Sequence, residues 1–281
     1  MKLGAILKIT RPHNCLLAGI GVLIGSIISV GSINEVPGWE VTFAFIAAAL
    51  ISGAGNTVND YADREVDSVN NPERPIPAGE ISPSEALLTS RILFVFGILS
   101  ATLIGKISCL LLAGFNSGLL AYYASSLKKK GLIGNLAISY LVGSTFLFGG
   151  LAVGGLEIVG ILSAMAALST AGRELIKDIE DIRGDRESGS ESFPLKAGRR
   201  KAATVGMILT ASAIALTPIP YLLGVMGKVY LGVVTISVGT FVAGMLIINR
   251  SQDRESAHTA SLTYKIGMSL GLFAFLLGSM L

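Results

Sequence analysis

The chain has 281 residues, of which 51% are hydrophobic and only 15% charged, with a mean hydropathy of +0.67 and a net charge of +3. Soluble domains carry about 25% charged residues, so the composition excludes an ordinary soluble protein. The apolar residues stand in continuous runs rather than alternating with polar ones, which argues against a membrane β-barrel. No nucleic-acid partner is expected.

Nine apolar runs are long enough to cross a bilayer as helices, since a crossing needs about 20 residues. In chain order they are 14–31, 41–58, 87–105, 107–125, 133–153, 157–177, 201–222, 229–248 and 263–280. In the first run, Gly21 and Gly25 have the spacing at which membrane helices pack closely. The sequence therefore predicts an all-α, polytopic membrane protein with nine transmembrane helices, forming a single domain over 1–281.

The distribution of lysine and arginine predicts the orientation of these helices, because cytoplasmic loops are enriched in positive charge. With the N-terminus inside, only Lys106 and Lys228 of the 22 basic residues lie outside. Of the 19 acidic residues, only Glu35, Glu40 and Glu157 do so. We therefore expect an integral protein of the cell membrane with a cytoplasmic N-terminus, an outer C-terminus and its chemistry on the cytoplasmic side.

An Asp-x2-Asp-x3-Asp motif occurs twice, at Asp60–Asp67 and Asp178–Asp185, with an offset of 118 residues. Downstream, the segment 75–79 is echoed by 194–198, and each copy then enters another apolar run. The two copies lie four runs apart, an even number, so they enter their loops in the same direction. This pattern favours an internal four-helix parallel repeat, although chance similarity of two short motifs stays open.

Each motif forms a polar stripe if it is helical, at about 100° per residue. Asn56, Asn59, Asp60, Asp63 and Asp67 fall within an arc of about 100°. Glu174, Asp178, Asp181 and Asp185 fall within about 60°. Carboxylates this close to a bilayer are costly and usually functional, and oxygen ligands suit magnesium held together with substrate phosphates. A merely solvated charged face is the alternative.

Basic residues that suit phosphate stand beside both motifs and in the loop between them. They are Arg74, Lys128, Lys129, Arg173 and Lys177. His13 and His258 are the only imidazoles, so histidine-rich metal chemistry has no support. No Walker A or GxGxxG element occurs, so nucleotide hydrolysis has none either.

The stretch Asn59-Asp-Tyr-Ala-Asp63-Arg-Glu-Val-Asp67, which continues through Arg74 to Gly79, resembles the first motif of the UbiA superfamily of intramembrane prenyltransferases. The second motif and Arg11-Pro-His-Asn14 resemble the archaeal digeranylgeranylglyceryl phosphate synthase branch. The resemblance implies Mg²⁺ as cofactor. Its ligands would be Asn59, Asp63, Asp67, Asp181 and Asp185, with Asp60 and Asp178 as second-sphere or acceptor-side catalytic residues.

The resemblance also implies the substrates, which are a prenyl diphosphate and a lipid phosphate within the membrane. Diphosphate would be contacted by a tyrosine and lysine of the middle loop, where Tyr122 or Tyr123 and Lys128 or Lys129 are the candidates. Arg11 and Asn14 would lie on the acceptor side. The aromatic ring of Tyr122, Phe146 or Phe148 would stabilise an allylic cation, or these side chains would serve only in packing or lipid contact. The oligomeric state stays open.

The activity that the branch implies is transfer of a geranylgeranyl group from geranylgeranyl diphosphate to the free hydroxyl of geranylgeranylglyceryl phosphate. A UbiA-type enzyme with an aromatic, quinone-type or porphyrin-derived acceptor is a second reading. A cation transporter that uses the carboxylates as an ion path is a third. A transporter places its charges near the bilayer midplane, whereas these lie at the ends of the apolar runs.

Overall fold

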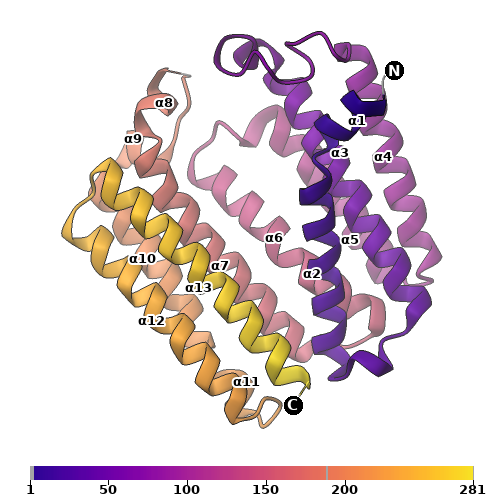
Figure 1. Ribbon diagram of the computed structural model, residues 1–281, viewed down its shortest axis with the longest axis vertical. Coiled ribbons are helices and arrows are strands. Elements are labelled where there is room, and N and C mark those ends of the chain that lie inside the picture. The colour runs from indigo at the N-terminus through magenta and orange to yellow at the C-terminus, as the bar shows by residue number, and fades with distance from the viewer. Residues whose placement is uncertain (1–2, 188, 281) are drawn as a thin grey trace. The chain divides into compact units, whose positions relative to one another are not determined.

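The structure is a computed structural model that describes residues 3–187 and 189–280. Its long elements are α2 (Pro12–Val30), α3 (Gly38–Asn70), α4 (Pro83–Leu103), α5 (Ile107–Tyr122), α6 (Leu132–Val153), α7 (Glu157–Glu180), α10 (Arg199–Leu216), α12 (Lys228–Arg250) and α13 (Arg254–Met280). Its short elements are α1 (Leu3–Thr10), η1 (Ile33–Glu35), the π-helical turn η2 (Tyr123–Leu127), α8 (Ile182–Glu187), α9 (Phe193–Ala197) and α11 (Ile219–Leu222). Figure 1 labels the helices along the chain.

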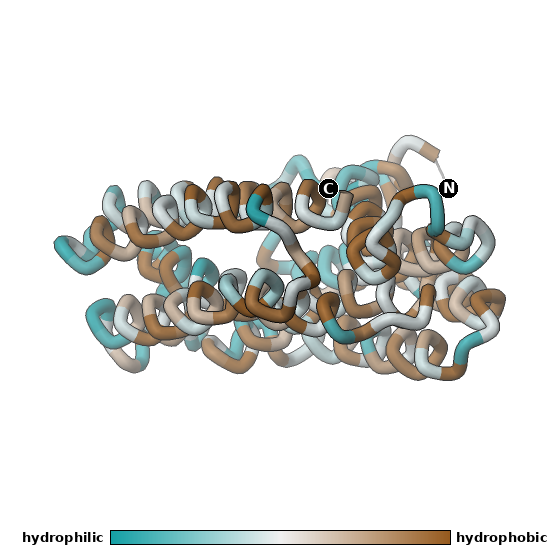
Figure 2. The backbone as a smooth tube through the Cα atoms, turned by 90° about the horizontal axis from the view of Figure 1, so that it is seen from below, coloured by the Kyte–Doolittle hydropathy of each residue, from teal (hydrophilic) through white to brown (hydrophobic). Residues whose placement is uncertain are grey.

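Nine helical segments in the described residues are long and apolar enough to cross a membrane, as predicted. Two of them combine elements, because α5 continues through η2 and α10 through α11. Figure 2 shows hydrophobic residues along the long helices and hydrophilic residues gathered toward helix ends and turns. The largest difference from the predicted runs is α3, whose 33 residues continue far beyond position 58. The helix does not stop where its apolar run stops.

The chain divides into two compact units. The first unit comprises Met1–Ser26, Val36–Leu127 and Thr145–Gly154, and the second unit comprises Ile27–Glu35, Lys128–Ser144 and Gly155–Leu281. Helices α2 and α6 each contribute residues to both units.

In the first unit, small residues let α2 and α6 approach at backbone distance. A Cβ atom at Gly25 would overlap the carbonyl oxygen of Phe146, and one at Gly149 would overlap that of Val22. Ser26 Oγ donates to the Gly149 carbonyl at 3.0 Å. Phe148 packs among alanines of α3 and α6 in the core of this unit. The close helix packing expected from Gly21 and Gly25 is therefore present.

In the second unit, α7 packs against α10 and α13, and α12 packs against α13. Gly172 of α7 faces Thr210 and the Gly206 carbonyl of α10 so closely that a Cβ would overlap both. Gly244 of α12 leaves room for the ring of Tyr264. The apolar core of this unit includes Ile176 and Ile179, which hold the last turns of α7 where the second aspartate motif begins.

Candidate active site

The first aspartate motif lies on one continuous helix. Helix α3 runs through the whole motif to Asn70. Asn71 caps its C-terminus, and the Asn71 backbone N–H donates to the Asp67 carbonyl. The polar stripe predicted for this copy therefore forms, because no break changes the helical phase between Asn56 and Asp67.

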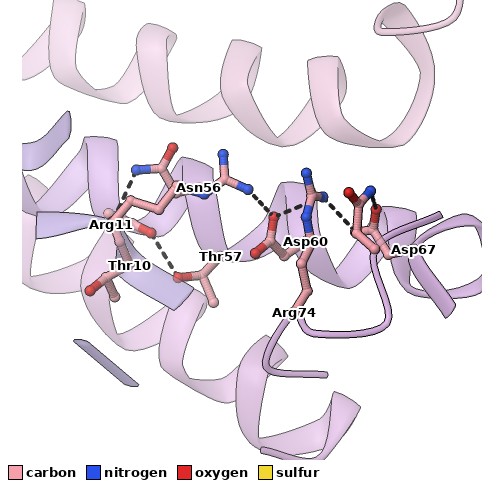
Figure 3. A network of polar contacts seen from close by, with 9 residues as sticks. Thr10, Arg11, Asn56, Thr57, Asp60, Asp67 and Arg74 are labelled. Atoms are coloured by element: carbon pink, nitrogen blue, oxygen red, sulfur yellow. Dashed lines mark hydrogen bonds and ion pairs between the residues drawn. The ribbon is translucent and has the colours of Figure 1, made fainter. Parts of the chain in front are cut away.

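Two arginines converge on the carboxylates of this motif (Figure 3). Arg11 Nη2 lies 2.6 Å from Asp60 Oδ1, and Arg74 Nη1 lies 3.7 Å from the same oxygen. Arg74 Nη1 also lies 2.6 Å from Asp67 Oδ2. The side chains of Asp60 and Asp67 are only 5% exposed. Burial of a carboxylate is costly unless a cation or donor compensates it, and here the arginines supply that compensation.

Arg11 reaches Asp60 because it forms the joint between α1 and α2. Its φ of +52° lies in the left-handed region, which a non-glycine residue adopts only where the surroundings demand it. Asn56, one helical turn before Asp60 on α3, donates from Nδ2 to the Thr10 carbonyl at 3.0 Å. This hydrogen bond links the end of α1 to α3. Asn14, predicted beside Arg11, lies half-buried in the first turn of α2, and its N–H bonds to the Arg11 carbonyl.

Asn59 and Asp63 offer the oxygen ligands that magnesium would need. Asn59 Oδ1 is buried and has no hydrogen-bond partner among the described residues, although an ion would satisfy it. Asp63 is half-buried. The described residues contain no cluster of three or more His, Cys, Asp or Glu side chains arranged to hold a metal. Carboxylates at i, i+3 and i+7 are spread over about 10 Å of helix, so this stripe needs further oxygens from elsewhere.

The second motif does not lie on one continuous helix. Helix α7 ends at Glu180, Asp181 caps it with φ −88° and ψ 2°, and Asp185 belongs to the short helix α8. The backbone N–H of Asp181 still bonds to the Lys177 carbonyl, so Asp181 stays in the phase of α7, and the single helical stripe expected for this copy is interrupted only before Asp185.

The second motif also has different partners from the first. Asn135 Nδ2 of α6 donates to Asp178 Oδ2 at 2.7 Å. Lys177 Nζ lies 3.4 Å from Asp181 Oδ2, and Arg173 pairs with the neighbouring Glu174 at 2.8 Å. In α8, burial raises the pKa of the Asp185 carboxyl, and the nearby Asp181 raises it further. A bound cation would lower that pKa, so Asp185 also suits a metal.

The middle loop carries the remaining predicted residues. Tyr122 ends α5 with half of its surface exposed, and Lys128 and Lys129 follow the π-helical turn with exposed side chains. The Lys129 carbonyl accepts a hydrogen bond from the Glu191 N–H at 3.1 Å, which joins this loop to the segment after the second motif. Phe148 and Phe146 are 4% and 8% exposed within the first unit. The buried position of Phe148 in the core favours plain packing.

Two polar residues that contact the motifs were not predicted. Asn71 Nδ2 donates to Asp67 Oδ1 at 3.0 Å, and Asn135 donates to Asp178. Asn135 could have been found, because it is an isolated amide near the start of an apolar run and polar residues inside such runs usually have a partner. The signal for Asn71 is weaker, since asparagine is common after helices.

Comparison with known proteins identifies the family. The sequence profile of the UbiA prenyltransferase family matches residues 18–274. A digeranylgeranylglyceryl phosphate synthase of Thermococcus kodakarensis is 40% identical over 280 residues, covering 100% of this chain and 99% of the relative. The protein of the same name from Methanothrix thermoacetophila is 42% identical over 273 residues, covering 97% and 98%.

Similarity to solved structures supports the same family assignment. One described as digeranylgeranylglyceryl phosphate synthase in membranes superposes with a TM-score of 0.91 at 36% identity, covering 99% of this chain and 98% of that one. A UbiA homolog from Archaeoglobus fulgidus bound to GPP and Mg²⁺ has the same fold, with a TM-score of 0.68 at 17% identity, covering 96% and 99%. The family match, together with the nine helices of the described residues that are long and apolar enough to cross a membrane, shows that this chain is an integral membrane protein that belongs to the UbiA prenyltransferase family.

Proposed function

We propose that this protein transfers a geranylgeranyl group from geranylgeranyl diphosphate to the free hydroxyl of geranylgeranylglyceryl phosphate. This reaction forms the second ether bond of an archaeal membrane lipid. The observation that carries the proposal is similarity along nearly the whole chain, at 39–42% identity, to several archaeal proteins named digeranylgeranylglyceryl phosphate synthase. A cation transporter, the third reading of the sequence, is not supported by membership of a prenyltransferase family.

Mg²⁺ is the proposed cofactor, with Asn59, Asp63, Asp67, Asp181 and Asp185 as its ligands. All five offer oxygen, the ligand atom that magnesium prefers, and a cation would satisfy Asn59 Oδ1, which is buried without a hydrogen-bond partner among the described residues. The A. fulgidus homolog, bound to GPP and Mg²⁺, is a fold-level precedent. When bound, the metal would neutralise charge that develops on the departing diphosphate.

The remaining site residues would bind and orient the two substrates. The proposed diphosphate contacts are Arg74, Tyr122, Lys128, Lys129, Arg173 and Lys177. Arginine binds phosphate oxygens in a bidentate manner, and Arg74 already stands beside two motif carboxylates. Arg11 and Asn14 would serve the acceptor side, while Asp60 and Asp178 would act close to the reacting groups. An apolar environment would keep water from the allylic cation.

The protein is proposed to lie in the cell membrane with its N-terminus and both motifs on the cytoplasmic side and its C-terminus outside. The positive-inside distribution supports this orientation. Residues 1–281 would act as one prenyltransferase domain, and the recurrence of the motif after 118 residues supports an internal repeat. Both substrates carry long prenyl chains, so a membrane enzyme meets them in the phase where they reside.

The test is an assay of the purified protein with geranylgeranyl diphosphate and a panel of acceptors. Geranylgeranylglyceryl phosphate should be prenylated far faster than 4-hydroxybenzoate or an uncharged phenol, and chelation of divalent metal should stop the reaction. Faster prenylation of an aromatic acceptor would overturn the ether-lipid proposal and favour the quinone-type reading. Assignment to the prenyltransferase family would stand in either case.

A further inference from the structure

Asn135 occupies an unusual place for an amide. It lies one turn inside α6, in the apolar stretch Leu132–Val153, and its Nδ2 donates to Asp178 Oδ2 at 2.7 Å. Asp178 is half-buried in the last turns of α7, where its neighbours Leu175, Ile176 and Ile179 are almost wholly buried. Among the described residues, Asn135 is the side chain that hydrogen-bonds this carboxylate. The amide therefore determines how the carboxylate is oriented.

The corresponding carboxylate of the first motif is held in another way. Asp60 has the same place in Asp-x2-Asp-x3-Asp as Asp178, yet it contacts two guanidinium groups, from Arg11 and Arg74. Opposite charges at such distances offset the negative charge of the Asp60 carboxylate. A neutral amide orients Asp178 without cancelling its charge. Two arginines thus occupy the Asp60 carboxylate, whereas the amide contacts only one oxygen of Asp178 and leaves the other oxygen for a substrate group.

The segment before Asn135 is anchored beside the second motif. Gly131 has φ +52°, and a Cβ there would crowd the Glu191 carbonyl oxygen and the Phe193 nitrogen. The adjacent Lys129 carbonyl accepts from the Glu191 N–H. Farther along α6, Ser163 Oγ of α7 donates to the Gly143 carbonyl at 2.8 Å. Contacts on both sides of Asn135 therefore hold α6 against α7 and against the segment that follows the second motif.

We infer that Asn135 is a positioning residue that holds the Asp178 carboxylate as proton acceptor for the acceptor hydroxyl. This inference rests on the proposed function. The hydroxyl oxygen forms a bond to the allylic carbon, and the bond from that carbon to the diphosphate oxygen breaks. The bonding electron pair leaves with the diphosphate, and the hydroxyl proton passes to Asp178. Asn135 leaves one oxygen of that carboxylate for the proton.

The competing explanation is that Asn135 only joins two helices, as amides do in membrane proteins. Asn135→Leu removes the donor but keeps the number and branching of the side-chain heavy atoms, and Asp178→Asn removes the proton acceptor. The combined Asn135→Asp and Asp178→Asn exchange keeps an amide and a carboxyl group in contact but reverses them. Ser139→Ala is the matched control, since Ser139 is buried one turn further along α6 and bonds only to the Asn135 backbone carbonyl among the described residues.

The measurements are kcat, the KM for each substrate, the Mg²⁺ concentration for half-maximal activity and the thermal stability, all with purified full-length protein. Asn135→Leu should lower kcat at least about tenfold and Asp178→Asn about a hundredfold, the range for loss of a general base. Neither should shift the Mg²⁺ requirement, whereas Asp181→Asn should. The exchange variant should recover stability but not kcat, and Ser139→Ala should match the wild type.

Recovery of kcat in the exchange variant would show that Asn135 only joins helices and would overturn the inference. So would normal kcat in Asn135→Leu, or a shift in its Mg²⁺ requirement equal to that of Asp181→Asn. Failure of the wild-type protein to prenylate geranylgeranylglyceryl phosphate would instead contradict the proposed function.

Discussion

Replacing Arg74 by methionine should leave one buried carboxylate of the first motif without a cation. Arg74 Nη1 lies 2.6 Å from Asp67 Oδ2, and without Arg74 the side-chain partner left to Asp67 among the described residues is the Asn71 amide. Asp60 still keeps Arg11 at 2.6 Å. Removing one partner of a fully buried ion pair costs about 3–5 kcal/mol. The Arg74 side chain is 31% exposed, so solvent screens part of this cost, and we expect a loss of about 2 kcal/mol.

A loss of that size corresponds to a fall in Tm of roughly 4–8 °C, measurable by thermal unfolding in detergent. Arg64→Met is the matched control, because Arg64 is 35% exposed but pairs with Glu65, which is 86% exposed. It should cost less than about 1 kcal/mol. Adding Asp67→Asn to Arg74→Met should recover most of the lost stability, since no buried charge then stays unpaired. The reasoning fails if Arg74→Met is as mild as Arg64→Met, or if the second substitution recovers nothing.

Two further predictions concern the metal and the topology. Asp63→Asn and Asp181→Asn should each lower turnover by at least about a hundredfold without loss of folding. After chelation of the wild-type protein, only added Mg²⁺ should restore activity. Near-full activity of either variant would remove that residue from the proposed ligands. In a background lacking Cys15 and Cys109, single cysteines at Ser68, Lys129 and Ser190 should react with an impermeant thiol reagent only from the cytoplasmic side, and one at Gly38 only from outside. The reverse labelling pattern would invert the proposed orientation.

Local pattern made most of the fold predictable. The nine spans follow from runs of apolar residues, because each run is both the cause of a membrane helix and visible in the sequence. The extension of α3 to Asn70 agrees with the single stripe that Asn56 and Asp67 were expected to share. The start of the chain was less predictable, since α1 is only eight residues long and its burial depends on packing against α3 and α4.

The side chains that contact the motif carboxylates could not be predicted from the sequence pattern. Arg11 and Asp60 are 49 residues apart, and Asn135 and Asp178 are 43 apart, so neither pair leaves a periodic trace. The chemistry of the motifs was readable as a set of oxygen ligands, but not which carboxylate each arginine contacts. The break at Asp181 was missed for another reason. Helical spacing was assumed to continue past Glu180, whereas α7 ends there and a separate short helix begins at Ile182.

The length of α3 has a consequence for where the products go. Thirty-three residues make a helix of about 50 Å, whereas the hydrocarbon layer is about 30 Å thick. Suppose that the helix starts at the outer boundary of the hydrocarbon layer and runs along the bilayer normal. Asn59 then lies at about the level of the opposite boundary, and Asp67 lies about 12 Å beyond that boundary, in water. A diphosphate released there would enter water directly, while the newly joined lipid would keep both tails in the bilayer. The helix would thus sort the two products by phase, and their separation would oppose the reverse reaction.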